Sequence, residues 1–319
     1  MEEKIISLLN NKQEYLSGEE LSSSLKVSRQ ALWKHINFLR ELGYDIAAVP
    51  HLGYRLISVP DRLYDFKVYQ GLKTKSFGRK ILYFDTLSST MDMATQLALK
   101  GAGEGTVVLA EVQTKGRGRL GRIWHSPKYK GLYFSLILRP NISLDKASII
   151  TLLAGVSICE AIKELSGLDL QIKWPNDILM HNKKLGGILT EIKTEVDEVN
   201  YIIIGVGLNI NNDSKSLISG ATSLKENKAS YHPSRLKILQ EVLYRLELNY
   251  QVLGKKGAKP IIDKWRQFAV TLGRRVKVYS HREHLEGEAF DIDSDGGLLI
   301  RNDSGITQKV IAGDVVHCR

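Results

Sequence analysis

The chain has 319 residues and a formal net charge of +10. This length allows two or three domains with a substantial core, and the basic balance favours nucleic acid, phosphorylated ligands or acidic partners without choosing among them. The two cysteines, Cys159 and Cys318, lie far apart and fit no metal-ligand spacing, so we expect free, reduced thiols and no metal site. The acidic start MEEKIISLLN and the lack of an apolar run of roughly 18 residues predict a soluble cytoplasmic protein without a signal peptide or membrane span.

Residues 1–60 are predicted to form a winged helix-turn-helix domain. Apolar residues in EEKIISLLN recur at helical spacing. Ser17 and Glu20 have the spacing of a capping box at the start of a second helix, and Ser28 is placed to cap a third helix. Alternating residues on both sides of the stretch PHLG (50–53) predict a two-stranded hairpin, which is the wing.

The third predicted helix carries side chains that can contact DNA. No acid occurs between Leu21 and Arg40, although this stretch holds four cations. Arg, Gln, Lys and Asn can bond to base edges in the major groove, and the alternative is a winged helix that serves protein contacts. The predicted DNA-binding residues are Ser28, Arg29, Gln30, Trp33, Lys34 and Asn37.

Residues 61–272 are predicted to form an α/β domain with a mixed sheet. A linking helix is expected to start near Asp61, and Ser89 is placed near the cap of the next helix. Strand patterns occupy 80–85, 106–112, 132–139, 170–174, 184–195 and 200–210, and helical patterns occupy 88–101, 145–165, 233–253 and the region around 260–269.

Residues 273–319 change to short alternating strands. The stretches 274–280, 286–302 and 306–318 have this pattern, and Ser-Asp-Gly-Gly at 294–297 is typical of a tight turn. We predict a small β-barrel or sandwich. The fold class is therefore α/β (α+β) with three domains.

The stretch QTKGRGRLGRIWHS matches G-x-G-x-x-G through Gly116, Gly118 and Gly121. A dinucleotide-binding loop would need a following helix and an acid about 20 residues on. The stretch is instead followed by a proline and a strand, no acid occurs between Val112 and Leu144, and no phosphate-binding G-x-x-x-x-G-K-[ST] pattern is present. The glycine pattern is therefore interpreted as a coincidence.

This acid-free stretch is strongly cationic. Its glycines let the backbone bring N–H groups near a ligand, and its arginines present planar donors suited to phosphates. It favours a triphosphate with a developing pyrophosphate, and the alternative is a flexible basic loop that contacts nucleic acid. The cations are Lys115, Arg117, Arg119, Arg122, Lys128, Lys130 and Arg139.

A second cluster lies in IKWPNDILMHNKKLGGILTEI. Pro175 is expected to fix a turn, and Asp177 can cap or orient a neighbour. The stretch HNK predicts a hairpin turn before Lys184, which begins the return strand. Gly186 and Gly187 inside that strand indicate a close approach of another group to the backbone. A plain hairpin with a β-bulge is the alternative.

A third stretch, IGVGLNI, interrupts a buried strand with Gly205 and Gly207 and ends near Asn209. Ordinary sheet packing would also account for these glycines.

The motifs GRGRLGR, KWPND, KLGGILTE and GVGLNI follow a winged helix in this order and precede a small β domain. This arrangement resembles the bifunctional biotin–protein ligases of the biotin operon repressor class, over essentially the whole chain. The resemblance implies a central domain of the class II synthetase-like type and an SH3-like barrel at the carboxyl end.

The resemblance also implies a two-step reaction. Biotin and ATP, with Mg²⁺, give biotinyl-5′-adenylate, and the biotinyl group then passes to a lysine on the carrier domain of acetyl-CoA carboxylase or pyruvate carboxylase. Adenylate binding produces a homodimer that binds operator DNA and represses biotin genes.

Site residues follow from the matching positions. Met91 departs from the asparagine often found third in the family's biotin motif, so its backbone is expected to matter more than its side chain. The resemblance assigns biotin to Ser89, Thr90, Met91, Gln113, Arg117, Gly118, Arg119 and Lys184, and the adenylate to Gly116, Arg122, Trp124 and Asn209. Catalytic roles fall to Lys184, Arg119 and, as a base for the acceptor amine or as a structural residue, Asp177.

Electrostatics agree with these roles. The first step brings a carboxylate next to a triphosphate, and Lys184 with the loop arginines would offset that repulsion in the transition state. A closing loop would keep water from the labile anhydride. Two rival functions are a biotin-sensing regulator without catalysis and a lipoyl or octanoyl ligase, although Gln113 and Ser89 suit a ureido ring better than an acyl chain.

Overall fold

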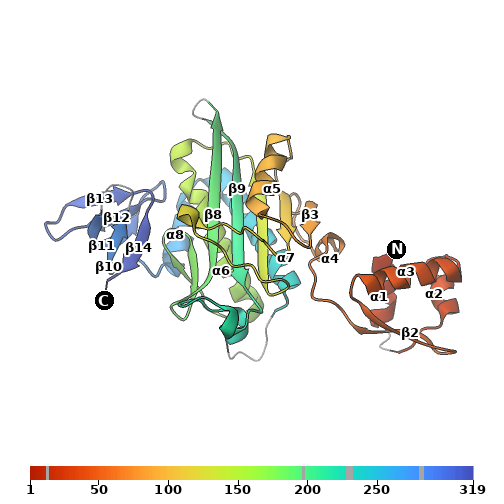
Figure 1. Ribbon diagram of the computed structural model, residues 1–319. Helices are drawn as coiled ribbons and strands as arrows, with labels where there is room; N and C mark the ends of the chain where they lie inside the picture. The colour runs from red at the N-terminus through yellow and green to blue at the C-terminus, as the bar shows by residue number, and fades with distance from the viewer. Residues whose placement is uncertain (12–13, 196–197, 228–232, 280–283, 319) are drawn as a thin grey trace. The chain divides into compact units, whose positions relative to one another are not determined.

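The computed structural model describes residues 1–11, 14–195, 198–227, 233–279 and 284–318. The chain divides into two compact units, Met1–Arg62 and Leu63–Arg319 (Figure 1). No helix within the described ranges is long and apolar enough to cross a membrane.

The first unit has the predicted winged helix-turn-helix elements. The Ser17 hydroxyl accepts a hydrogen bond from the Glu20 amide, and the Glu20 carboxylate accepts one from the Ser17 amide, so the capping box is confirmed. Ser28 caps the third helix. The apolar faces of the helices and the wing form one core. The elements are α1 (Glu2–Asn11), α2 (Gly18–Leu25), α3 (Arg29–Glu41), β1 (Asp45–Val49) and β2 (Gly53–Ser58).

The linking helix begins later than predicted. α4 spans Asp65–Gln70 rather than starting near Asp61. Tyr64 is extended, and the Leu63 amide donates to the carboxylate of Glu111 at 2.8 Å instead of entering a helix. That carboxylate is fully buried and also pairs with Arg235 at 2.7 Å. A tertiary contact therefore sets where this helix starts.

The second unit is built on a seven-stranded mixed sheet with the order β3-β4-β5-β9-β8-β7-β6. β3 and β4 are parallel and the other neighbours are antiparallel. All eight residues of β5 are buried, which fits a strand covered on both faces. The strands are β3 (Lys80–Phe84), β4 (Thr106–Ala110), β5 (Gly131–Leu138), β6 (Gln171–Lys173), β7 (Asp177–Met180), β8 (Lys183–Glu195) and β9 (Glu198–Asn209).

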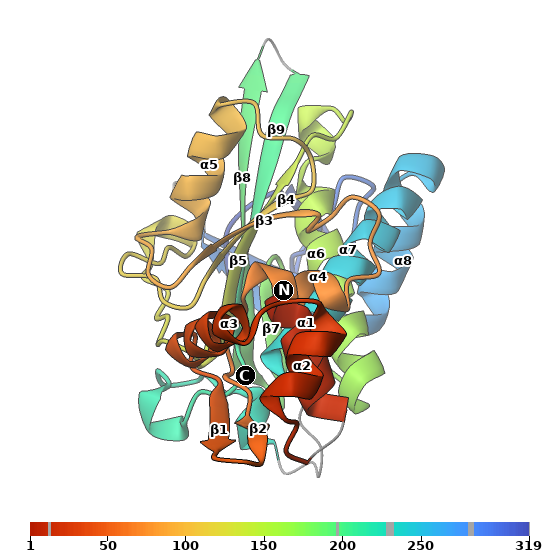
Figure 2. The ribbon, with the colours of Figure 1, turned by 90° about the vertical axis from the view of Figure 1, so that its right-hand side faces the viewer.

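Helices cover the two faces of this sheet unequally. Figure 2 shows α5 on one side of β8 and β9, and α6, α7 and α8 on the other. The α5 side has a small apolar cluster, whereas the opposite side holds the main core. The α5 face therefore has room for a ligand. The helices are α5 (Thr90–Leu99), α6 (Ser148–Ser166), α7 (Arg235–Lys256) and α8 (Lys259–Phe268).

The carboxyl-terminal strands form a five-stranded antiparallel sheet, which confirms the predicted small β domain. It is joined to the central sheet through Trp174, whose amide donates to Thr271 Oγ1 and whose indole donates to the Gly296 carbonyl. The predicted boundaries at 60 and 272 remain predictions. The strands are β10 (Arg274–Tyr279), β11 (His284–Ile292), β12 (Leu298–Arg301), β13 (Thr307–Val310) and β14 (Asp314–His317).

Candidate active site

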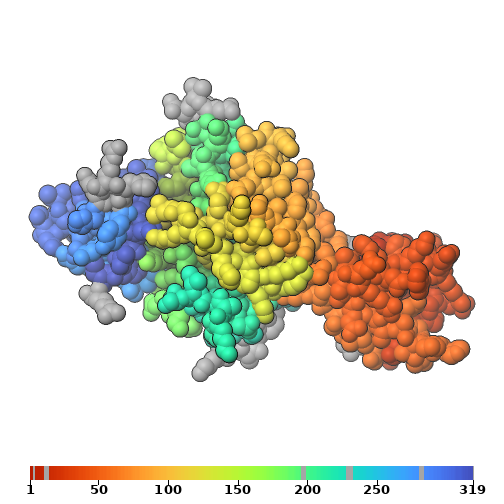
Figure 3. Space-filling model, in the orientation of Figure 1, coloured from red at the N-terminus to blue at the C-terminus, as the bar shows by residue number. Residues whose placement is uncertain are grey.

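A cavity of about 340 Å³ opens beside β8 and β9. Its wall comes from the start of α5, the loop 113–126, the two strands, residues 212–221 and β14. In Figure 3 the loop, coloured yellow, covers this face of the sheet, with the 212–221 segment in blue-green beside it. This size is typical of a small-molecule site.

Glycines hollow the sheet beneath this cavity. A Cβ atom on Gly207 would lie 2.4 Å from the Trp124 indole, and one on Gly187 would lie 3.4 Å from the same ring. A Cβ atom on Gly205 would lie 2.5 Å from the Met91 sulfur. Of the paired glycines predicted to be closely approached, Gly186 is approached by Leu208, whose Cδ2 would lie 2.3 Å from an added Cβ atom, and Gly187 is in ordinary contact with the Trp124 indole.

Gln113 joins the loop to the start of α5. Its side-chain oxygen accepts from the Thr90 amide at 2.8 Å and from the Thr90 hydroxyl at 3.0 Å. Its amide nitrogen donates to Ser126 at 3.1 Å, while Ser135 donates to the Thr90 hydroxyl at 2.9 Å. Ser89 is fully buried as the helix cap and does not line the cavity.

A β-bulge directs Lys184 into the cavity. Ile178 of β7 pairs with Gly186, but the adjacent Leu179 pairs with Lys184, so β8 carries one extra residue. The extra residue resets the alternation of side chains. Lys184 consequently lies on the same face as Gly187, whose Cβ atom would be 3.5 Å from the lysine Cε.

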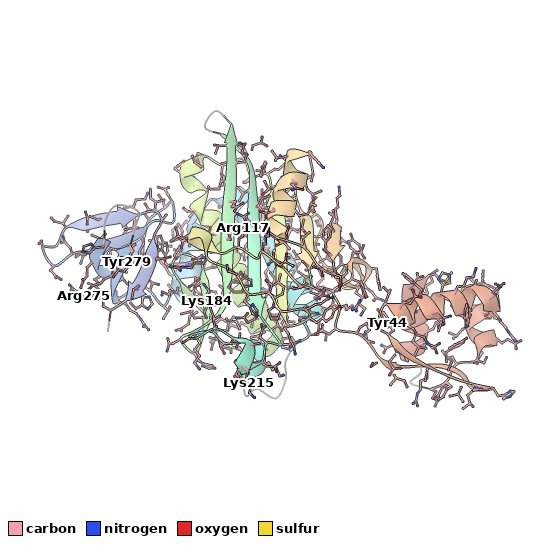
Figure 4. The ribbon with its side chains drawn as sticks, viewed as in Figure 1. Tyr44, Arg117, Lys184, Lys215, Arg275 and Tyr279 are labelled. Atoms are coloured by element: carbon pink, nitrogen blue, oxygen red, sulfur yellow. The ribbon has the colours of Figure 1, made fainter. Side chains whose placement is uncertain are left out.

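Lys184 forms an ion pair with Asp177. The lysine Nζ lies 2.7 Å from the Asp177 carboxylate and 5.8 Å from the centre of the Trp124 ring. Figure 4 shows Lys184 and Arg117 along the same side of the central sheet. Lys184 and Asp177, which are both predicted to have catalytic roles, are therefore in direct contact.

The loop is folded back on itself. The Gly118 amide donates to the Arg122 carbonyl at 2.7 Å, and the Trp124 amide donates to the Gly116 carbonyl at 2.9 Å. Leu120 has a φ of 53° at the tip. The predicted absence of a helix is confirmed, apart from a single 3₁₀ turn at Arg119–Gly121.

Three loop arginines contact other segments of the unit. Burial lowers the pKa of Arg119 from its usual value, and the carboxylates of Asp314 and Asp177 oppose that shift. The loop is therefore held over the sheet from several sides. Arg117 contacts Asp92 (2.7 Å) and Glu191 (2.9 Å), Arg119 contacts Asn176 (3.0 Å) and Gly313 (3.2 Å), and Arg122 contacts Asp314.

Most predicted site residues meet at this cavity. Gly116 does not line the cavity, and a Cβ atom at this position would lie 2.5 Å from the Trp124 carbonyl oxygen. The chemical roles of the predicted site residues remain predictions. The predicted residues that line the cavity are Thr90, Met91, Gln113, Arg117, Gly118, Arg119, Arg122, Trp124, Asp177, Lys184 and Asn209.

Sequence reasoning missed part of the wall. The segment 212–221 has no motif, yet it joins the site because the Lys184 amide donates to Gly220 at 2.9 Å and Asn209 donates to the Thr222 carbonyl at 3.1 Å. Lys173, in the motif KWPND, could have been flagged as a cation at a strand end. No sequence motif indicated that residues 314–316 of the small β domain line the cavity.

The predicted DNA-binding residues lie on α3, apart from Ser28, which caps this helix. Trp33 is 54% exposed, and Gln30 and Lys34 are also exposed. Arg29 pairs with Glu19 at 2.8 Å. These exposed side chains are accessible to a DNA groove, and their role in DNA binding remains a prediction.

The chain matches three protein families in order. Residues 2–55 match a helix-turn-helix domain, residues 83–209 the biotin/lipoate A/B protein ligase family, and residues 271–318 the biotin protein ligase C-terminal domain. A Bacillus subtilis relative, the bifunctional ligase/repressor BirA, is 40% identical over 95% of this chain and 94% of its own length. The chain belongs to the biotin protein ligase family.

Two further comparisons agree with this family. The Escherichia coli bifunctional ligase/repressor BirA is 31% identical over 98% of this chain and 95% of its own length. The structure of an Aquifex aeolicus biotin protein ligase in complex with biotin and ATP has a TM-score of 0.64 and 30% identity, covering 76% of this chain and 99% of the other. The predicted family, fold class and enzyme class, a biotin–protein ligase, are confirmed.

Proposed function

We propose that this biotin ligase converts biotin and ATP to biotinyl-5′-adenylate and pyrophosphate. It then transfers the biotinyl group to a lysine on the carrier domain of acetyl-CoA carboxylase or pyruvate carboxylase. The observation that carries the proposal is the meeting of Lys184 and the loop arginines with a glycine-hollowed sheet in one cavity. The Aquifex relative, which holds biotin and ATP, supports the same pair of substrates.

The biotin rings would lie on the hollowed part of the sheet. Trp124 packs over Gly207 and Met91 over Gly205, so the biotin rings would lie against these two side chains, which supply an apolar surface. The Gln113–Thr90 hydrogen bonds present donors and acceptors at one end of this space, which suits a ureido group. Ser89 would act indirectly, by fixing the start of α5.

Charge placement supports the adenylation step. The biotin carboxylate attacks the α-phosphorus of ATP, and the bond to the bridging oxygen of the β-phosphate breaks. Lys184 and Arg119 stabilise the negative charge that gathers there. Arg122, Trp124 and Asn209 would border the adenylate, and Mg²⁺ would accompany ATP, held mainly by its phosphates.

Asp177 would have two roles in succession. Its 2.7 Å ion pair with Lys184 holds that side chain toward the reacting atoms during adenylation. For the transfer step, the acceptor amine must lose a proton before it attacks the anhydride carbonyl. Asp177 would accept that proton.

The winged helix adds a regulatory function. We propose that adenylate binding promotes homodimers, which bind a two-fold operator through α3 and repress biotin genes. The bifunctional ligase/repressor relatives support this combination in one chain.

Exchange of radiolabelled pyrophosphate into ATP tests the adenylation proposal. We expect exchange that depends on biotin and does not occur with lipoate or octanoate, followed by labelling of a purified carrier domain. Exchange with lipoate alone would assign the chain to the lipoyl ligases. Biotin binding without any exchange would leave a sensor in place of an enzyme.

A further inference from the structure

A cationic loop connects α4 to β3 in the second unit, and none of its residues lines the candidate active site. We call residues 73–80 the α4–β3 loop. No acid occurs between Asp65 and Asp85 in the sequence. Figure 2 shows this orange segment passing over α7 on its way from α4 to β3. The exposed cations of the loop are Lys73, Lys75, Arg79 and Lys80.

Buried groups hold the α4–β3 loop in place. The carboxylate of Glu247 on α7 accepts hydrogen bonds from three consecutive backbone amides, those of residues 75–77, at 2.7, 2.6 and 2.9 Å. Glu247 and the Phe77 side chain are both buried. The Gly78 amide donates to the Gly105 carbonyl at 2.8 Å. Because the backbone is anchored from within, the cations at the surface are preorganised, and a ligand would lose little free energy in ordering them.

The exposed cations of the loop are not neutralised by acids. Within the residues that the structure describes, none of the four side chains forms an ion pair with a carboxylate. The Arg79 guanidinium donates to the Thr74 carbonyl, and the Lys73 ammonium lies 6.0 Å from the centre of the Tyr244 ring. These partners are uncharged. The loop therefore presents positive charge to solvent.

Another acid-free stretch shows a different arrangement. Residues 264–279 hold five cations and no acid, but four of these cations pair with carboxylates from other parts of the chain. A run of cations in the sequence therefore does not by itself produce a charged surface, and the α4–β3 loop differs in leaving its cations unpaired. The pairs are Lys264–Glu160 (2.7 Å), Arg266–Asp291 (2.8 Å), Arg275–Asp303 (2.7 Å) and Lys277–Glu286 (3.1 Å).

The two units of the chain differ in net charge. Residues 1–62 hold eight Lys and Arg and eight Asp and Glu, so the formal charge of +10 belongs to residues 63–319. A protein gains affinity for DNA by placing cations at phosphates, because condensed counterions are then released. A winged helix without net charge supplies little of this affinity beyond its own polarised face. Cations of the second unit could supply more.

The covalent chain keeps the α4–β3 loop near the winged helix. Lys73 follows Arg62, the last residue of the first unit, by eleven residues. A chain of this length spans at most about 40 Å even when fully extended, which corresponds to about twelve base pairs of duplex. Duplex that continues beyond a half-site is therefore within reach of the loop.

We propose that the α4–β3 loop binds phosphates of the operator duplex beside the half-site that α3 contacts. This inference rests on the proposed operator binding, and it adds the ligase unit to the DNA-contacting surface. Contacts to phosphates carry no sequence information. The loop thus supplies affinity, whereas α3 supplies the preference for the operator.

Lys75→Gln/Lys80→Gln tests the inference. In gel-shift titrations with biotin and ATP present, we expect this double variant to weaken binding to operator and to random duplex alike, by about tenfold or more. The ratio of the two affinities should stay as in the wild type. The slope of log affinity against log salt should become less steep by about 3 to 4, since each of four lost contacts in a dimer contributes about 0.9.

Lys255→Gln/Lys256→Gln is the matched control, because these two lysines are exposed at the end of α7 and their loss changes the net charge equally. It should alter neither the affinity nor the salt slope. Lys75→Arg/Lys80→Arg keeps the charge and should retain both values. Thermal unfolding and biotin-dependent pyrophosphate exchange should be the same in all variants, which excludes a folding defect.

The possible outcomes separate this inference from the proposed repression. Unchanged affinity and an unchanged salt slope in Lys75→Gln/Lys80→Gln would overturn the inference while leaving operator binding intact. A wild type that binds operator and random duplex equally, with binding that this variant weakens, would support the loop and remove the proposed operator recognition. A raised KM for the carrier domain with unaltered DNA binding would assign the loop to a protein partner and overturn the inference.

Discussion

At the scale of single residues, the site depends on glycines, which have no side chain, as well as on the charged side chains beside them. Gly187 and Gly207 pair across β8 and β9, and the Trp124 indole occupies the space that their side chains would fill. Lys184 then faces this hollow, next to Asp177. We therefore expect a group added at Gly207 to affect biotin binding, and removal of the Lys184 side chain to affect the reaction rate.

Gly207→Ala adds a methyl group against Trp124. The new Cβ atom would meet the ring at 2.4 Å, so the indole must shift. We expect biotin affinity to fall by about tenfold, because overpacking costs about 1–3 kcal/mol. Calorimetric titration with biotin measures this change. Gly254→Ala is the control, since open space surrounds that helical position, and equal affinities for the two variants would contradict the proposed ring site.

Lys184→Ala removes the cation from the reacting carboxylate and phosphate. We expect biotin-dependent pyrophosphate exchange to slow by about a hundredfold, the size of effect seen when one charge-stabilising donor is lost. The adjacent Lys183 is exposed at the start of β8, and Lys183→Ala should leave the rate unchanged. An unaltered rate in Lys184→Ala would count against its catalytic role.

His317 should make stability depend on pH. Burial lowers its pKa to about 4 in the folded protein, whereas an unfolded histidine titrates near 6.5. The unfolded state therefore binds more protons between these values, and this contribution to stability is lost as pH falls from about 6.5 to 4. His317→Gln should flatten that part of a denaturation profile. His284→Gln, an exposed control, should not, and an unchanged slope in the first variant would reject the assignment.

At the scale of elements, the loop after β4 is a folded flap whose arginines reach four other segments, at Asp92, Glu191, Asn176 and 313–314. Arg119 connects it to Asn176 and to Gly313 of the small β domain. The bulge in β8 also helps to close the cavity, because it turns Lys184 toward the flap. The flap and the hairpin therefore close one cavity from two sides.

Arg119→Gly should loosen the adenylate more than free biotin. The substitution removes both a charge and the contacts that hold the flap, so the labile intermediate loses its cover. We expect the retention time of the adenylate, measured by stopped-flow chase, to fall by about tenfold or more. Lys115→Gly tests flap flexibility alone, because Lys115 is exposed. Equal retention in wild type and Arg119→Gly would refute the proposal.

At the scale of the whole molecule, the central and small β domains share the candidate site. Asp314 contacts Arg122, and residues 314–316 of β14 line the cavity beside β8 and β9. The carboxyl-terminal domain is thus a component of the proposed ATP site. The winged helix forms its own compact unit, so its regulation by ligand is proposed to act through dimerisation.

Operator affinity should depend on the ligands of the ligase. A duplex that carries the two-fold repeat upstream of the biotin genes should bind about tenfold more tightly when biotin and ATP are present, which is a typical coupling between two sites. Gel-shift titration with sedimentation analysis measures affinity and dimer formation together. Lys34→Ala should weaken binding, whereas Lys4→Ala on α1 should not. Equal affinity with and without the ligands would refute this regulation.

The sequence predicted element types well where local chemistry decides them. Ser17, Ser28 and Ser89 cap helices at the predicted positions, because a capping hydroxyl needs only the backbone three residues on. The sequence did not predict where the linking helix starts: the helix begins after Asp61, because the Leu63 amide donates to a buried carboxylate that is distant in sequence.

By itself, the sequence determined the family, the fold class, the cationic loop and the set of residues for which chemical roles are proposed, since these depend on composition, motifs and local spacing. The tertiary structure decided which face Lys184 occupies, what fills the space over Gly207, and that the segment 212–221 lines the cavity. These features depend on strand register and on contacts between residues far apart in the chain. Local patterns do not specify such contacts, because one shifted pairing turns every later side chain to the opposite face.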